Sequence, residues 1–496
     1  MVHQSQRPWS CDRCHALKER CRWTPGSFHC ERCSRLGHLC QRVRPLRKPG
    51  RPSRDSLRLR AGAGPLSNKK SSNGRAGQPP SIPSPVALYS HRSSSSASPT
   101  DRLATVAQTR APLVRNVSVN GDLSGLDLRL LDRILFRDDF LEQFVVGPSF
   151  CESHRKLLVS RLLSCKPALQ DSYLAFGLLW SHEPSLLPDG RQLNDSFKRA
   201  SSALSTLRSF QVRDAHDVSV CLVLGLTILS FATKLGATDA RTICNQTLSL
   251  VKPIYKSKPC PDPADYGFIY CLVLTDIAEC LLLTKLPTLR LELPPGTDYV
   301  DRHVGPLATL LPHLHDICEL SSAMLHGSAP GAPACDVAEA LDALELAIHA
   351  WRPPMPKGLA ARFSAAEVAH MVCQAQTMRA AAMLILHRLR HPFGSQLESA
   401  RALSSTILTQ LDLTVRATGK VPRCVDLPLI IACLELEDEA VRARWLRSMS
   451  PIGAYSSPFH ERIKRMLTTV WAGRRHFSAM YWYHLGSFTS LIPDPR

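Results

Sequence analysis

Six cysteines near the amino terminus have the type and spacing of metal ligands. In chain order they are Cys11, Cys14, Cys21, Cys30, Cys33 and Cys40. An eleven-residue unit occurs twice, since Cys11–Cys21 aligns with Cys30–Cys40. Each unit reads Cys, acid, Arg, Cys, two residues, Leu, three residues, Cys. This duplication predicts two similar half-structures related by a pseudo-twofold axis.

Metal rather than disulfides is expected to hold this segment together. About forty residues cannot bury enough apolar surface to fold unaided. The other twelve of the 18 cysteines are scattered singly through a Leu- and Ala-rich region, as reduced, buried cysteines usually are. A Cys-x2-Cys pair places two sulfur atoms on one helical turn, and the positive end of that helix favours their thiolate forms.

The number of sulfur atoms predicts two zinc ions per chain. Zinc prefers four ligands in a tetrahedron, so two ions need eight coordination positions. Six sulfurs fill those positions only if two of them bridge, and the repeat makes its equivalent first cysteines, Cys11 and Cys30, the bridging pair. His15, His29 and His38 are nearby nitrogen donors, but six thiolates already complete both sites.

The positive charge of the chain is confined to its first quarter. Of the 496 residues, 1–120 hold 22 Lys and Arg against 5 Asp and Glu, a balance of +17. The remaining 376 residues hold 39 against 37, a balance of +2. This distribution predicts a polyanionic partner for the first segment alone.

The cysteine segment resembles the fungal zinc binuclear cluster (six-cysteine) transcription factors. Its spacing matches that family's pattern, and Cys11-Asp-Arg-Cys-His-x-x-Lys-x-Arg-Cys21 matches the first half in residue type. The resemblance implies a short first helix that enters the DNA major groove and reads a CGG-type triplet. It also implies base contacts by Lys18 and phosphate contacts by His15, Arg20 and Arg22.

The two units differ at the residue that would read DNA. Lys18 in the first unit corresponds to Gly37 in the second. An ammonium group can donate to O6 and N7 of guanine, whereas glycine offers only its backbone. The first unit is therefore predicted to read the sequence and the second to support it.

A basic tail follows the last cysteine directly. Its charge density suits phosphate neutralisation and nuclear import, which predicts double-stranded DNA as partner and the nucleus as location. Residues 1–8 are polar and do not resemble a secretory signal. The predicted phosphate contacts of the tail are Arg42, Arg44, Arg47, Lys48 and Arg51.

Composition predicts three regions: a small metal-organised α module with its basic tail (1–52), a disordered linker (53–124) and a large all-α regulatory domain (125–496). Residues 61–120 contain 23 Gly, Pro or Ser, too polar a composition to offset the entropy of ordering. Farther on, Leu, Ala and Val recur at three- and four-residue spacing. Ser364-Ala-Ala-Glu367 is a capping box that opens a helix ended by Pro392. Further helices are predicted near 126–146, 153–181, 195–235, 264–285, 305–325, 335–351, 427–447 and 459–485.

The helical region shows no catalytic motif, which predicts that the chain is not an enzyme. The apolar run Val218–Ala232 is shorter than the roughly 20 residues of a membrane span, so a buried core helix is expected and no membrane partner. His182, His387 and His391 have apolar or basic neighbours and are predicted to be structural. The acidic cluster Glu435–Glu439 is interpreted as a solvated helix face, with contact to the transcription machinery as the alternative.

Three segments of this region are similar to the regulatory middle region of the same family, particularly of members that govern secondary-metabolite gene clusters. This similarity implies a helical regulatory domain that binds an effector or a partner. The segments are Phe144–Phe150, Asp276–Cys280 with Leu286–Arg290, and Leu386–Gly394.

Together these patterns predict a nuclear transcription factor, most simply an activator of RNA polymerase II genes. Two other hypotheses are a metal-handling protein that buffers zinc and an enzyme with an appended zinc module. No heptad repeat follows Cys40, so both a monomer and a homodimer remain open.

Overall fold

The computed structural model divides the chain into two units, Met1–Ser90 and His91–Arg496, and each is described by itself. Except for Leu123 and Ser124, the predicted linker 53–124 lies outside the residues that the structure describes. The described residues are 14, 18, 21–22, 30–36, 123–180, 191–236, 240–257, 262–293, 299–326, 334–354, 356–449, 457–474 and 479–489.

The described residues of the second unit form helices and contain no strand, so the all-α prediction is confirmed for them. Asp301 and Gly305 form an isolated antiparallel bridge. In the first unit the described helix is α2 (Glu31–Arg35). The α-helices of the second unit are α4 (Gly125–Phe136), α5 (Asp138–Leu141), α6 (Cys151–Ser164), α7 (Lys166–Trp180), α8 (Arg191–Ser209), α9 (Ala215–Lys234), α10 (Ala240–Ser257), α11 (Tyr266–Leu283), α12 (Leu311–His326), α13 (Ala334–Ala350), α14 (Leu359–Arg362), α15 (Ala365–Arg390), α16 (Leu397–Thr418), α17 (Asp426–Leu434), α18 (Glu439–Ser448), α19 (Ser457–Gly473) and α20 (Leu485–Thr489). The 3-10 helices are η3 (Pro148–Phe150), η4 (Pro263–Asp265), η5 (Ala308–Leu310) and η6 (Trp482–His484).

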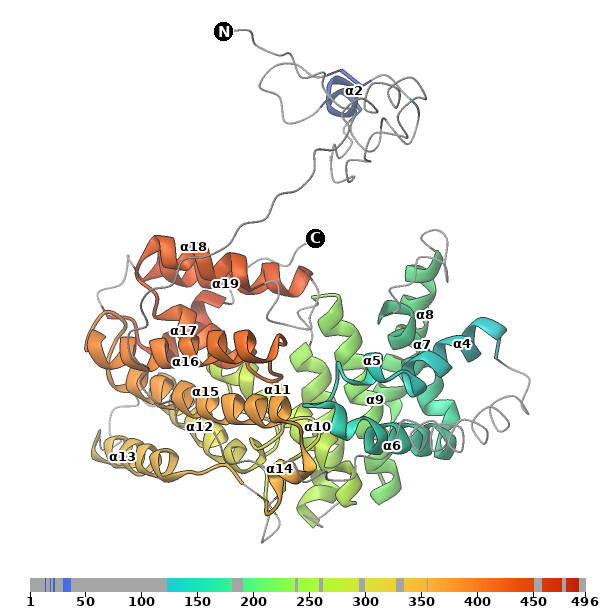
Figure 1. Ribbon diagram of the computed structural model, residues 1–496, viewed down its shortest axis with the longest axis horizontal. Helices are drawn as coiled ribbons and strands as arrows, with labels where there is room; N and C mark the ends of the chain where they lie inside the picture. The colour runs from blue at the N-terminus through green and yellow to red at the C-terminus, as the bar shows by residue number, and fades with distance from the viewer. Residues whose placement is uncertain are drawn as a thin grey trace, which may run out of the picture. The chain divides into compact units, whose positions relative to one another are not determined.

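Helices α9 and α11 form the centre of this unit. In Figure 1, α4 to α9 lie to the right of α11, and α12, α13 and α15 to α18 lie to its left. Both central helices are apolar around most of their circumference and bury most of their residues. The predicted core helix at Val218–Ala232 is confirmed as the buried part of α9.

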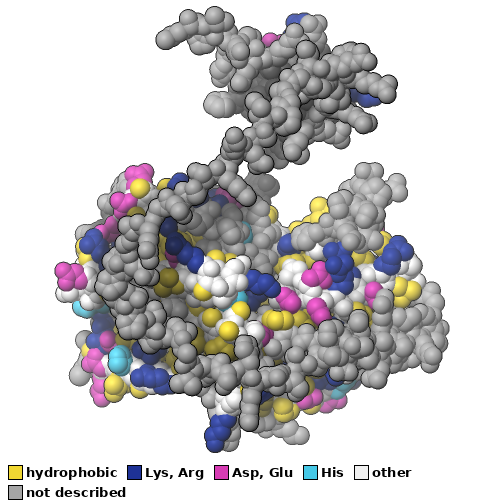
Figure 2. All heavy atoms as spheres, viewed as in Figure 1, with side chains coloured by type: hydrophobic (Ala, Val, Ile, Leu, Met, Phe, Trp, Pro, Cys, Tyr) yellow, Lys and Arg dark blue, Asp and Glu magenta, His cyan; other side chains and the backbone are white. Residues whose placement is uncertain are grey.

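Two segments, Ala215–Lys234 and Pro263–Leu283, are long and apolar enough to cross a membrane by length and composition alone. In each, 67% of the most apolar window is buried inside the fold, as in the core helices of soluble proteins. Lys and Arg side chains are interspersed with Asp and Glu on the described face of this unit in Figure 2, in keeping with the near-zero charge balance of residues 121–496.

Helix α15 begins and ends where the sequence predicts. Ser364 is its N-cap, and the Ser364 hydroxyl and the Glu367 carboxylate each accept a hydrogen bond from the other residue's backbone N–H. The helix ends at Arg390, with His391 as the C-cap directly before Pro392.

Other helix boundaries differ from the prediction. The predicted helices over 153–181, 195–235 and 427–447 are each two helices, separated at Cys165, 210–214 and 435–438. The prediction lacks the short helix α14 and two long helices, α10 and α16, which lie against α9 and α15 respectively.

Candidate zinc centre

Three sulfur atoms of the predicted ligand set lie together in the first unit. The Sγ atoms of Cys14, Cys30 and Cys33 are all within 4.8 Å of one another, and their residues are at most 1% exposed. Cys21 is half-buried and packs against this group. The four residues come from both repeat units, so the fold brings the two halves of the duplication into contact.

In the second cysteine repeat, Cys30–Cys40, the Cys-x2-Cys spacing places both cysteines on one helical turn, as predicted. Cys30 is the N-cap of α2 and Cys33 lies in its first turn, where the Cys33 N–H donates to Cys30 Sγ at 3.4 Å. The Glu31 N–H donates to the Arg22 carbonyl oxygen at 3.0 Å. This bond attaches the start of α2 to the residue that follows the first cysteine repeat, Cys11–Cys21.

Hydrogen bonds favour the thiolate form of Cys30. Burial alone would raise the pKa of its thiol. Hydrogen bonds from the Cys33 backbone and from the Cys33, Cys14 and Cys21 side chains outweigh burial and lower the pKa to about 6. The single cysteines of the helical unit behave differently, since burial raises the pKa of Cys221 and of Cys433 to about 12.

The distance between the Cys14 and Cys30 sulfur atoms suits two ligands of one zinc ion and is too long for a disulfide bond between them. Cys14 Sγ and Cys30 Sγ are 3.7 Å apart, whereas bonded sulfurs are separated by about 2 Å. Two thiolates on one tetrahedral zinc, each about 2.3 Å from the ion, lie about 3.8 Å apart. The residues present therefore fit a thiolate zinc site, in which Cys30 lies beside a sulfur atom of each cysteine repeat.

Lys18 and Arg22 are exposed, as DNA-contacting side chains must be. Lys18 lies in a turn and has a left-handed backbone with φ of 53°. The remaining predicted ligands and DNA contacts lie outside the described residues: Cys11, Cys40, His15, Arg20, Arg42, Arg44, Arg47, Lys48 and Arg51.

One further group of potential metal ligands occurs among the described residues, His315, Asp316 and Glu319 of α12. Arg290 already occupies this group, because its Nη1 lies 2.6 Å from Asp316 Oδ1. Burial lowers the pKa of His315, which favours its neutral form. We interpret the group as an ion-pair cluster at the surface of the helical unit.

The helical unit matches a known family over most of its length. The sequence model described as "Fungal specific transcription factor domain" matches residues 135–487. The chain belongs to this family of fungal transcription factors. Its match to the C6 finger transcription factor traC of Penicillium crustosum is 52% identical over 48 residues, 10% of this chain and 11% of that protein. The chain thus aligns with about a tenth of this relative, and no solved structure matches it significantly.

The first of the three segments similar to the family's regulatory region is held by Glu367 of α15. Ser149 donates to this carboxylate through its backbone N–H (2.8 Å) and its hydroxyl (2.9 Å). Burial would raise the pKa of Glu367, but the hydrogen bonds from Ser149 and Ser364 hold it below its usual range. One side chain therefore both caps α15 and fixes the segment Phe144–Phe150.

Two other buried charges hold the remaining segments of the fungal transcription factor domain. Asp276 accepts a hydrogen bond from the Thr288 N–H at 2.6 Å, which joins Asp276–Cys280 to Leu286–Arg290. The buried Arg388 guanidinium donates twice to the Glu435 carboxylate, at 2.7 Å each, and also to the Pro392 carbonyl oxygen.

The interpretation of Glu435–Glu439 as a solvated helix face is wrong for its first residue. Glu435 is 4% exposed, because it compensates the charge of Arg388. The cluster lies between two helices, with Asp438 as the N-cap of α18. Burial lowers the pKa of His387, whose ring packs 4.9 Å from that of His391, in agreement with structural roles. His182 lies outside the described residues.

Proposed function

We propose that this transcription regulator is a nuclear, zinc-dependent protein that binds DNA sequence-specifically through residues 1–52. The observation that carries the proposal is the group of buried sulfurs drawn from both halves of a duplicated cysteine unit. In this proposal residues 53–124 are a disordered linker and residues 125–496 regulate the DNA-binding module.

Two zinc ions organise the module, with six thiolates as ligands and Cys11 and Cys30 as bridges. The position of Cys30 supports this arrangement, because Cys30 lies beside Cys14 of the first cysteine repeat and Cys33 of the second. Cys11 is its counterpart in the repeat. Metal binding supplies the folding free energy of so small a module.

Lys18 reads guanine in a CGG-type triplet, and the surrounding basic residues neutralise phosphates. The exposure of Lys18 and the confinement of +17 of the charge to residues 1–120 support this assignment. His15, Arg20 and Arg22 contact phosphates beside the triplet, and the basic tail extends the contact.

The similarity to regulators of secondary metabolism suggests a biosynthetic gene cluster as the target, with activation as the effect. Co-regulators are the expected partners of the helical unit. A homodimer would place two modules on paired half-sites.

The test measures binding of the zinc-loaded full chain to a CGG-containing duplex and to a scrambled duplex at about 150 mM salt. We expect Lys18→Ala to lose about 1–3 kcal/mol of discrimination between the duplexes while retaining its zinc. Fluorescence anisotropy titrations give both affinities, and elemental analysis gives the zinc content.

Lys48→Ala is the matched control, since it removes the same charge from the tail. It should weaken binding to both duplexes equally, because a phosphate contact carries no sequence information. Equal binding of the unmodified chain to both duplexes would contradict sequence-specific recognition. Readily exchanging zinc without any DNA affinity would instead favour the metal-handling hypothesis.

A further inference from the structure

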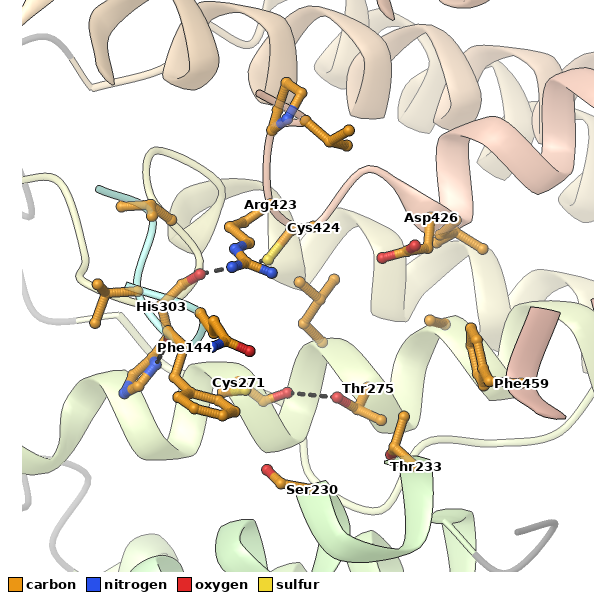
Figure 3. Close-up of a pocket in the computed structure, with 18 of the residues that line it drawn as sticks. Phe144, Ser230, Thr233, Cys271, Thr275, His303, Arg423, Cys424, Asp426 and Phe459 are labelled. Atoms are coloured by element: carbon orange, nitrogen blue, oxygen red, sulfur yellow. Dashed lines mark hydrogen bonds between the residues drawn. The ribbon is translucent and has the colours of Figure 1, made fainter. Parts of the chain in front are cut away.

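The helical unit contains a large cavity that no part of the proposed DNA-binding function uses. Its volume is about 1140 Å³, slightly above the usual range of small-molecule sites. It lies between α9, α11 and α19 and the chain segments 142–148 and 418–427 (Figure 3). The fold therefore leaves space at its centre for a molecule of drug size.

Most of the cavity wall is apolar. Aromatic rings and aliphatic side chains line it, which favours a ligand with a hydrophobic body. The side chains that supply this surface include Phe144, Trp180, Leu229, Leu274, Phe459 and Met466.

Three hydroxyl groups in the wall offer acceptor oxygens. Ser230, Thr233 and Thr275 each donate to the backbone carbonyl four residues earlier in their helix, at 2.9 Å in every case. Their hydrogens are therefore committed within α9 and α11. Figure 3 shows these side chains around the same space as Asp426. In this arrangement the hydroxyl oxygens can accept hydrogen bonds from N–H or O–H groups of a ligand.

Glu279 of α11 adds a carboxyl group to the same wall. Its oxygens make no hydrogen bond or ion pair within the described part of the chain. Burial raises its pKa to about 7, although Arg462 and Arg241 lower it. A protonated amine from a ligand would compensate this carboxylate where no described side chain is within ion-pairing distance.

Four Lys and Arg side chains line the cavity, and one of them, Arg462, lowers the pKa of Glu279 by its charge. Arg423 donates to the Glu142 carbonyl oxygen at 3.2 Å, and Lys420 pairs with the Glu142 carboxylate at 3.2 Å. Arg465 Nε donates to the Glu461 carbonyl oxygen at 3.4 Å. Glu279, by contrast, makes no ion pair in the described part of the chain, so the wall around it favours a cationic donor over an anion.

We propose that this cavity binds an apolar small molecule bearing a protonated amine, with the amine at Glu279 and the hydroxyl groups of α9 and α11. The hydrophobic body packs against the apolar side chains of the wall. This site lies wholly in the helical unit, so the proposal is independent of DNA recognition by the zinc module.

The test uses three fluorescent probes that share one apolar body: pyrenebutylamine, pyrenebutanol and pyrenebutyric acid. Each is titrated with the purified full chain near neutral pH. We expect the amine to bind most tightly, the alcohol less tightly and the acid least. Glu279→Gln should weaken the amine about tenfold and leave the alcohol within about twofold, because it removes the charge but retains an acceptor oxygen.

Two further variants keep the proposal falsifiable. Thr275→Val removes an acceptor without changing charge and should weaken both the amine and the alcohol severalfold. Glu398→Gln is the matched control, since Glu398 is exposed on α16 and does not line the cavity; it should change no affinity. Thermal unfolding of each variant verifies its fold. Tighter binding of the acid than of the amine, or an unchanged amine affinity in the Glu279 variant, would overturn the proposal.

Discussion

At the scale of single residues, the helical unit depends on charges buried inside its core. Arg388 is completely buried, and its guanidinium is satisfied by the Glu435 carboxylate and by two backbone carbonyls. Removing one partner of such a pair leaves an uncompensated charge in a medium of low dielectric constant. The pair therefore joins α15 to the end of α17, and neither partner can be removed alone without leaving a buried charge.

Glu435→Gln tests this dependence. The substitution keeps the shape of the side chain but leaves Arg388 without a counter-charge, and we expect a loss of about 3–5 kcal/mol in the free energy of unfolding. Glu437→Gln is the matched control, because the pair of Glu437 with Arg401 is solvent-exposed and should contribute no more than about 1 kcal/mol. Denaturant unfolding followed by circular dichroism measures both. Similar losses in the two variants would contradict a special role for the buried pair.

At the scale of helices and loops, the contact between η3 and the start of α15 requires a glycine. A Cβ atom on Gly147 would lie 2.5 Å from Glu367 Cγ. The Gly147 backbone is extended, with φ of −171°, which any residue adopts, so the requirement is for space alone. Glu367 cannot give way easily, because four hydrogen bonds from Ser149 and Ser364 hold its carboxylate.

Gly147→Ala should therefore destabilise the helical unit by about 1–3 kcal/mol, the usual cost of overpacking. Gly125→Ala provides the control, since a Cβ there would lie 4.0 Å from its nearest neighbour; it should change stability by no more than about 0.5 kcal/mol. Denaturant midpoints of the two variants decide between them. A neutral Gly147 variant would mean that the segment is free to move away from α15.

The helix boundaries show how far local sequence determines this fold. Helix α15 could be predicted because Ser364, Glu367 and Pro392 act on their own neighbours in the chain. The break at Cys165 (φ −145°, ψ 57°) also has a local signal, because Pro167 lies in the first turn of α7, where a proline is tolerated, and would disrupt a helix that continued from α6. Helix α10 could not be predicted from the sequence. Pro253 is a residue that usually ends a helix, and the polar Thr247 lies on the buried face of α10, against Gly225.

The two candidate sites differ in the same way. The grouping of Cys14, Cys30 and Cys33 could be predicted from spacing alone, because Cys30 and Cys33 share one turn and the repeat pairs them with the first half. The cavity gave no such signal. Its hydroxyl groups and Glu279 lie on helices far apart in the chain, and only the packing of α9 against α11 brings them to one wall.

At the scale of the whole molecule, the chain joins two units whose stability has different sources. The helical unit buries a continuous apolar core. The described core of the first unit consists of cysteines, and in the function proposed above zinc supplies the stability that apolar area supplies elsewhere. Zinc removal should therefore unfold the first unit and leave the second folded.

Native mass spectrometry of the full chain should find two zinc ions, and a chelator should abolish hydrogen-exchange protection in residues 30–36 while leaving that of α9 and α11 unchanged. Cys14→Ala should reproduce the effect of the chelator, because a missing thiolate opens the coordination of one ion. Cys165→Ala, which removes a half-buried cysteine between α6 and α7, should retain both ions. A count other than two ions, or cooperative folding of the first unit in the Cys14 variant, would contradict the shared binuclear cluster. Loss of zinc together with unfolding of the helical unit would show instead that the two units stabilise each other.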